Sequence, residues 1–94
     1  MEDFKVNICG VPHKVYYKED CFTSDGLHLG EIHYKNSEIY ICKGMVPELE
    51  KQTLIHEMLH GLLLHVGYTK LCEDEQFVQV LAQAMTGCFE VIRM

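Results

Sequence analysis

The pattern that most constrains this chain is "HEMLH" (56–60), which lies inside the apolar stretch "TLIHEMLHGLLLH" (53–65). Such a stretch is typical of an α-helix, where two histidines four positions apart project about 40° apart around the axis, one turn above the other. The imidazoles of His56 and His60 can therefore converge on one metal ion. Glu57 projects about 100° from His56, close enough to reach a water on that ion without being a ligand. The spacing predicts a metal site beside a carboxylate base.

Zinc suits this arrangement, because it accepts imidazole nitrogen readily and tolerates an open position for water. Water at such a site ionises near neutral pH, and a nearby carboxylate can take its proton and deliver it to a leaving amine. We therefore expect Zn²⁺ as the cofactor, His56 and His60 as ligands and Glu57 as the catalytic base. Tyr40 and Tyr68 are candidate donors to a developing oxyanion.

Two histidines do not complete a zinc site, and three sources of a third ligand are open. His65 lies nine positions after His56 and so projects to the opposite side of the helix. The second source is an isolated histidine of the N-terminal half, namely His13, His28 or His33. The third is the acidic cluster "EDE" (73–75), which opens the next helix and returns toward the first. Asp74 suits an N-cap, whereas Glu75 is the first residue with a helical side-chain direction, so we expect Glu75 to be the ligand.

The order of patterned segments predicts an α+β fold. Alternating apolar and polar residues over 4–18 and 31–44 indicate two antiparallel hairpins, separated by a loop over 19–30. A first helix is expected over about 48–66, with Pro47 in its first turn and a stop at Gly67. A second, ligand-bearing helix is expected over about 74–92. One apolar face of the first helix is expected from the spacing of Leu54, Ile55, Leu59, Leu62 and Val66.

The composition narrows the function classes. Ninety-four residues with 48% apolar content support a single domain, 1–94, with one modest core. A formal charge of −6 without a basic patch argues against nucleic-acid binding. No apolar run is long enough to cross a membrane, and the acidic start "MEDFKVNICG" is unlike a secretory signal, so we expect a cytoplasmic protein. Five cysteines without CxxC spacing are expected to be reduced and mostly buried.

The two motifs together resemble a known group of proteins. "LIHEMLHGLLLH" followed by "DEQFVQVLAQAM" is similar to the small HExxH proteins of the gluzincin group, especially the ImmA/IrrE-like and minigluzincin-type proteins carried by phages and other mobile elements. Their second motif reads roughly Glu-x-x-Ala-x-x-Phe-Ala, and "EQFVQVLA" (75–82) follows it with conservative replacements. The resemblance covers about residues 39 to 85. It implies a small zincin-like domain that hydrolyses peptide bonds of a peptide or protein substrate, with a regulatory protein as one candidate partner.

The resemblance carries two further expectations. It implies that the strand before the first helix, Ile39 to Cys42, lines the cleft and pairs with an extended peptide. The sequence also differs from the gluzincin pattern at one position. Larger gluzincins place an aspartate four residues after the ligand glutamate to support a ligand histidine, and here that residue is Gln79. Glutamine can accept an imidazole N–H but supplies no charge. The alternative function is therefore a zinc-binding regulatory or interaction protein with little or no peptidase activity.

Overall fold

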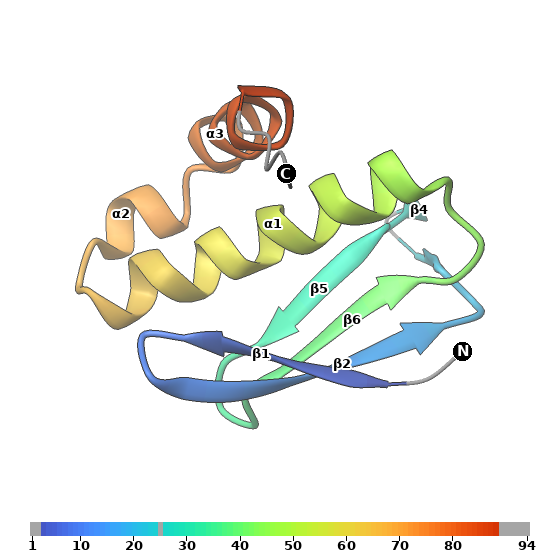
Figure 1. Cartoon of the computed structure of the whole chain (residues 1–94), viewed down its shortest axis with the longest axis horizontal. Coiled ribbons are helices and arrows are strands. Elements are labelled where there is room, and N and C mark those ends of the chain that lie inside the picture. The colour runs from blue at the N-terminus through green and yellow to red at the C-terminus, as the bar shows by residue number, and fades with distance from the viewer. Residues whose placement is uncertain (1–2, 25, 89–94) are drawn as a thin grey trace, which may run out of the picture.

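The structure of the chain, a computed structural model, describes residues 3–24 and 26–88, without the side chains of Thr23 and Cys88. Within these residues the strands come first and the helices last, which confirms the α+β class (Figure 1). The elements are β1 (Phe4–Ile8), β2 (Val11–Lys18), β3 (Phe22–Thr23), β4 (Gly26–Leu27), β5 (Gly30–His33), β6 (Glu38–Cys42), α1 (Pro47–His65), α2 (Thr69–Cys72) and α3 (Glu75–Cys88).

The four-stranded sheet has the order β1-β2-β6-β5. Both expected hairpins are present, since β1 pairs with β2 and β5 with β6 in antiparallel fashion. The hairpins join through parallel pairing of β2 with β6, so the sheet is mixed and not wholly antiparallel. Its two central strands carry fully buried residues, Val15, Ile39 and Ile41, which face α1. The turn of the first hairpin lies at Cys9-Gly10, where both residues have positive φ.

The segment expected to be a loop contains a second, two-stranded sheet formed by β3 and β4. Among the described elements, β3 and β4 pack only against each other. A disulfide between Cys21 and Cys42 joins the start of this segment to the end of β6, with the two Cα atoms 5.9 Å apart. The expectation of reduced cysteines is therefore wrong for this pair. Their 21-residue separation follows no short spacing rule, and only the folded sheet brings them together.

Helix α1 lies between the sheet and α3, as Figure 1 shows. One side packs Leu54 and Met58 on the sheet, and the other packs Leu59 and Leu63 against α2 and α3. The expected single apolar face is thus only partly correct. The discrepancy arises because α1 is covered on two sides and carries apolar residues on both. Two members of the expected face are exposed, Leu62 and Val66.

The ends of α1 agree with the expected signals. Pro47 occupies the first turn, and Gly67 follows the helix with φ of 89°. The connection that follows contains the short helix α2, which was not expected. Asp74 caps α3, since its Oδ1 accepts the Phe77 N–H at 3.0 Å. The expected end of the second helix near residue 92 lies outside the described residues. None of the described helices has the length and apolar character needed to span a membrane.

Candidate metal centre

Three side chains from two helices meet at one point above the sheet. His56 and His60 project from α1, and Glu75 projects from the first turn of α3. Nε2 of His56 lies 3.2 Å from Nε2 of His60 and 3.2 Å from Oε2 of Glu75. Nε2 of His60 lies 2.9 Å from Oε1 of Glu75. The structure therefore brings together the three residues expected to bind the metal.

The spacing of these atoms suits a tetrahedral ion. Ligand atoms about 2.0–2.1 Å from a tetrahedral zinc lie roughly 3.3 Å from one another. The separations of 2.9–3.2 Å are slightly shorter, so a small outward movement of the side chains would admit the ion. His56 and His60 are largely buried, with side chains 14% and 8% exposed, whereas Glu75 is 72% exposed. The third ligand thus closes the site from the solvent side.

Hydrogen bonds on the far side of each ring orient both imidazoles. Nδ1 of His60 donates to the backbone carbonyl of Cys72 at 2.6 Å, and a carbonyl oxygen can only accept. Nδ1 of His56 donates to Oε1 of Gln79 at 2.8 Å, which is the role expected for that glutamine. In the neutral rings each Nε2 then presents a lone pair toward the other and toward the Glu75 carboxylate. These electron-rich atoms repel one another unless a cation, a metal ion or a proton, lies among them.

Glu57 lies beside this centre and is only 7% exposed. Burial raises its pKa to about 8, and the nearby negative charges of Glu75 and Glu31 add to the effect. A carboxyl group whose pKa lies near neutrality is suited to take up and release a proton. A metal ion at the centre would lower the pKa of Glu57.

A glycine makes room for the Glu57 carboxylate. Gly30, the first residue of β5, passes so close to α1 that an added Cβ would lie 2.8 Å from Cγ2 of Thr53 and 3.1 Å from Oε2 of Glu57. Its backbone has no positive φ, so glycine is needed here for space rather than for conformation. This close approach was not foreseen from the sequence.

The centre opens into a cleft of about 630 Å³ between α1, α3 and the edge strand β5. Its walls include residues 27–32, the N-terminal half of α1 and the start of α3. A second cavity of about 350 Å³ shares Tyr34, His60 and Glu75 with the cleft and extends it past the centre toward α2. The expectation that β6 lines the cleft is wrong. β6 is paired on both sides, by β2 and β5, so its backbone has no free edge for a peptide.

The other four histidines are not part of the group formed by His56, His60 and Glu75. His65 is exposed, and its ring packs edge-on against that of the buried His13, with centroids 5.8 Å apart. His33 is exposed on the opposite face of the sheet, near Glu31. His28 lines the cleft, but among the described residues only His56, His60 and Glu75 form a metal-binding group.

The tyrosine that lines the cleft is neither of the two singled out in the sequence. Tyr40 stacks on Tyr16 and donates to Glu38, and Tyr68 is 62% exposed; neither borders the cleft. Tyr34 lies in the turn directly after β5 and lines the cleft, and its hydroxyl lies 3.4 Å from Sγ of Cys72 in α2. Burial, followed by the contact with Cys72, raises the pKa of Tyr34, so its hydroxyl remains a proton donor. The period-two spacing of Gly30, Ile32 and Tyr34 was the signal that could have identified it.

Comparisons with protein-family models, with curated proteins and with solved structures found no match to this chain. The family expected from its motifs therefore remains a prediction.

Proposed function

We propose that this protein is a zinc-dependent metallopeptidase with a zincin-like arrangement. One observation carries the proposal: two imidazoles, each with its Nδ1 proton held by an acceptor, direct Nε2 toward a carboxylate at distances that suit a tetrahedral ion. His56, His60 and Glu75 would hold the zinc. When bound, zinc supplies the Lewis acidity that makes a water nucleophilic near neutral pH.

The side chains around the centre have distinct roles in this proposal. Glu57 would take a proton from the attacking water and deliver it to the leaving amine, because its buried carboxylate lines the cleft next to the two histidines. Tyr34 is the tyrosine that would stabilise the developing oxyanion, because it borders both the main cleft and its extension. Gln79 and the Cys72 carbonyl fix the orientation of the two histidines.

The substrate is a peptide or protein segment in extended form. Among the described strands β5 pairs only with β6, which leaves its other edge free beside the cleft. An extended chain pairing with this edge would gain main-chain hydrogen bonds with little sequence selectivity. This assigns to β5 the role that the family resemblance implied for β6. A regulatory protein as substrate, the absence of nucleic-acid and membrane partners and a cytoplasmic location remain predictions, and disulfides such as Cys21–Cys42 are rare in cytosolic proteins.

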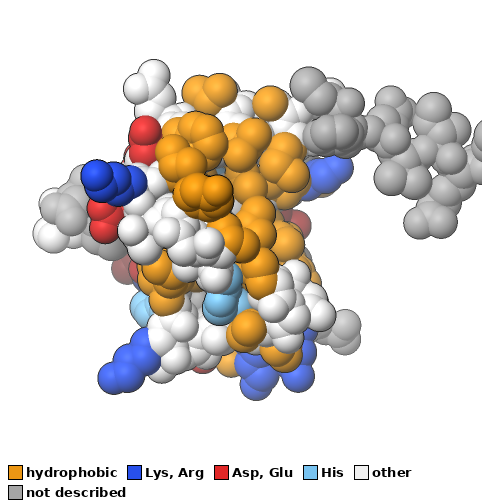
Figure 2. Space-filling view, turned by 90° about the vertical axis from the view of Figure 1, so that its left-hand side faces the viewer, with side chains coloured by type: hydrophobic (Ala, Val, Ile, Leu, Met, Phe, Trp, Pro, Cys, Tyr) orange, Lys and Arg blue, Asp and Glu red, His pale blue; other side chains and the backbone are white. Residues whose placement is uncertain are grey.

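A zinc-binding interaction protein is the second candidate, and one surface favours it. Exposed hydrophobic side chains of the helices gather in a patch on the end of the molecule that carries α2 (Figure 2). Exposed residues of the helices include Leu62, Val66, Leu71, Phe77, Val80 and Met85. Large exposed apolar patches often mark surfaces that bind other proteins.

Replacing Glu57 by glutamine separates the two candidates. Glu57→Gln keeps the size of the side chain and removes the base, so a peptidase would retain its zinc and lose hydrolysis of an unstructured protein such as casein. An interaction protein would retain zinc and show no zinc-dependent hydrolysis in either form. Loss of zinc in the Glu57→Gln variant would contradict the assignment of Glu57 as base and not ligand.

A further inference from the structure

One wall of the cleft is formed by Leu27, His28 and Leu29, which precede the edge strand β5. Leu27 pairs with Phe22 in the small β3–β4 sheet, which packs against no other described element. Phe22 is 72% and Leu27 55% exposed, and His28 is also exposed, so side-chain burial contributes little to holding this wall against the domain.

Two backbone hydrogen bonds attach the wall, and both involve the disulfide cysteines. The carbonyl of Cys21 accepts the N–H of His28 at 2.8 Å, and the N–H of Cys42 donates to the carbonyl of Leu29 at 2.8 Å. The Cys21–Cys42 bond thus covalently joins the two backbone partners of the wall, one just before β3 and one at the end of β6.

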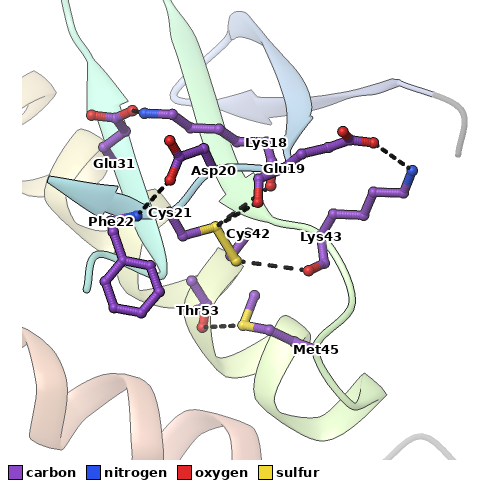
Figure 3. The surroundings of a disulfide bond; sticks show 10 residues. All are labelled: Lys18, Glu19, Asp20, Cys21, Phe22, Glu31, Cys42, Lys43, Met45 and Thr53. Carbon is purple, nitrogen blue, oxygen red and sulfur yellow. Dashed lines mark hydrogen bonds and ion pairs between the residues drawn. A yellow bond between two sulfur atoms is a disulfide. The ribbon is translucent and has the colours of Figure 1, made fainter.

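Two side-chain ion pairs lie near the disulfide (Figure 3). Lys18 pairs with Glu31 at 2.9 Å and Lys43 with Glu19 at 3.2 Å. All four side chains are at least 41% exposed, and ion pairs of this kind add little stability. Among the described residues the disulfide is therefore the only covalent cross-link that ties the far end of the wall, through Cys21, to the main sheet.

We propose that the Cys21–Cys42 disulfide is a redox switch for the cleft, in which reduction releases the wall formed by Leu27, His28 and Leu29 and weakens substrate binding without affecting the metal centre. The effect on substrate rests on the proposed peptidase function, but the release of the wall does not. The metal ligands come from α1 and α3, so opening the disulfide leaves their positions intact.

The chemistry of the switch is thiol–disulfide exchange with a dithiol reductant. One thiolate of the reductant attacks Sγ of Cys42, the more exposed of the two cysteines, and Cys21 leaves as a thiolate. The second thiol of the reductant then attacks the reductant sulfur bonded to Cys42, closes a ring and releases Cys42 as a thiolate. Two electrons pass from the dithiol, which becomes a cyclic disulfide, and its two protons end on the two cysteine thiols.

Amide hydrogen exchange of zinc-loaded protein, measured by NMR, tests the proposal directly. The Cys21→Ser/Cys42→Ser double variant mimics the reduced state without a reductant that could chelate zinc. We expect the His28 amide to exchange roughly 10- to 100-fold faster in this variant than in the oxidised parent, while amides of α1 exchange at the parent rate. Dithiothreitol should produce the same change in the parent, and in Cys9→Ser, which lacks only an exposed free thiol.

Two results would overturn the proposal. If His28 exchanges equally fast in the double variant and the parent, the disulfide does not hold the wall. If protection of α1 is lost together with that of His28, in both the double variant and the dithiothreitol-treated parent, the disulfide stabilises the whole fold and is not a local switch. Neither readout requires hydrolysis, so an inactive protein would refute the proposed peptidase function and leave this test in force.

Discussion

Burial of Glu57 predicts a pH dependence of stability in the metal-free protein. The folded-state pKa is about 8, against an ordinary value of 4.5. The folded chain therefore keeps a proton that the unfolded chain loses as the pH rises through this range. The contribution of Glu57 to stability is complete below pH 4.5 and falls as the pH rises toward 8.

The size of the effect follows from proton linkage. One extra proton bound by the folded state lowers the free energy of unfolding by about 1.4 kcal/mol for each pH unit. Over pH 5 to 8 the loss is on the order of 3 kcal/mol. A domain of this size has a total stability of roughly 5–10 kcal/mol, so the loss is a large share of it. Glu57→Gln removes the ionisable group and should remove this loss.

Urea denaturation followed by circular dichroism, in the presence of EDTA, measures the difference between parent and variant. All other side chains are common to both proteins, so their contributions largely cancel in the comparison. We expect Glu57→Gln to match the parent near pH 5 and to exceed its stability by a few kcal/mol at pH 8. If the free energies of unfolding of the parent and of Glu57→Gln changed with pH in parallel over this range, the burial of an ionisable group at this position would be refuted.

Three further predictions concern the surroundings of the centre. Gly30→Ala should destabilise the protein by about 1–3 kcal/mol and reduce hydrolysis more than zinc affinity, because the new methyl group meets Thr53 and Glu57. Gly87→Ala, where nothing lies within 4 Å of the added Cβ, is the control. Urea denaturation and a hydrolysis assay compare the two variants. Glu75→Gln should weaken zinc binding by orders of magnitude in competition with a chelator, whereas Asp74→Asn should bind like the parent because asparagine also caps a helix. Gln79→Leu should lower zinc affinity about 10-fold, since the Nδ1 proton of His56 loses its acceptor; unchanged affinity would show that this hydrogen bond does not tune the site.

Local signals predicted the elements of this fold well. The alternation of 4–18 and 31–44 predicted both hairpins, and Pro47 and Gly67 marked the ends of α1 within one or two residues. The parallel pairing of β2 with β6 could not be read from the sequence, because it depends on how two locally formed hairpins meet. The disulfide depends on the same meeting, which brings Cys21 next to Cys42.

The candidate site was predictable in its helical part and not in its strand part. The spacing of His56 and His60 and the cap at Asp74 are local features of helices, and together they led to Glu75. The contribution of β5 depends on which strand lies at the edge of the sheet next to α1. That order is a property of the assembled sheet, so the sequence pointed to the neighbouring strand β6 instead.

The zinc content of the purified protein tests the central claim most directly. Elemental analysis by mass spectrometry, after dialysis against a weak chelator, should find about one zinc per chain in the parent, bound by His56, His60 and Glu75. His60→Ala should retain almost none, and His65→Ala, which alters a histidine outside the cluster, should retain the parent amount. A parent protein without bound zinc, or a folded His60→Ala variant that keeps it, would contradict the account.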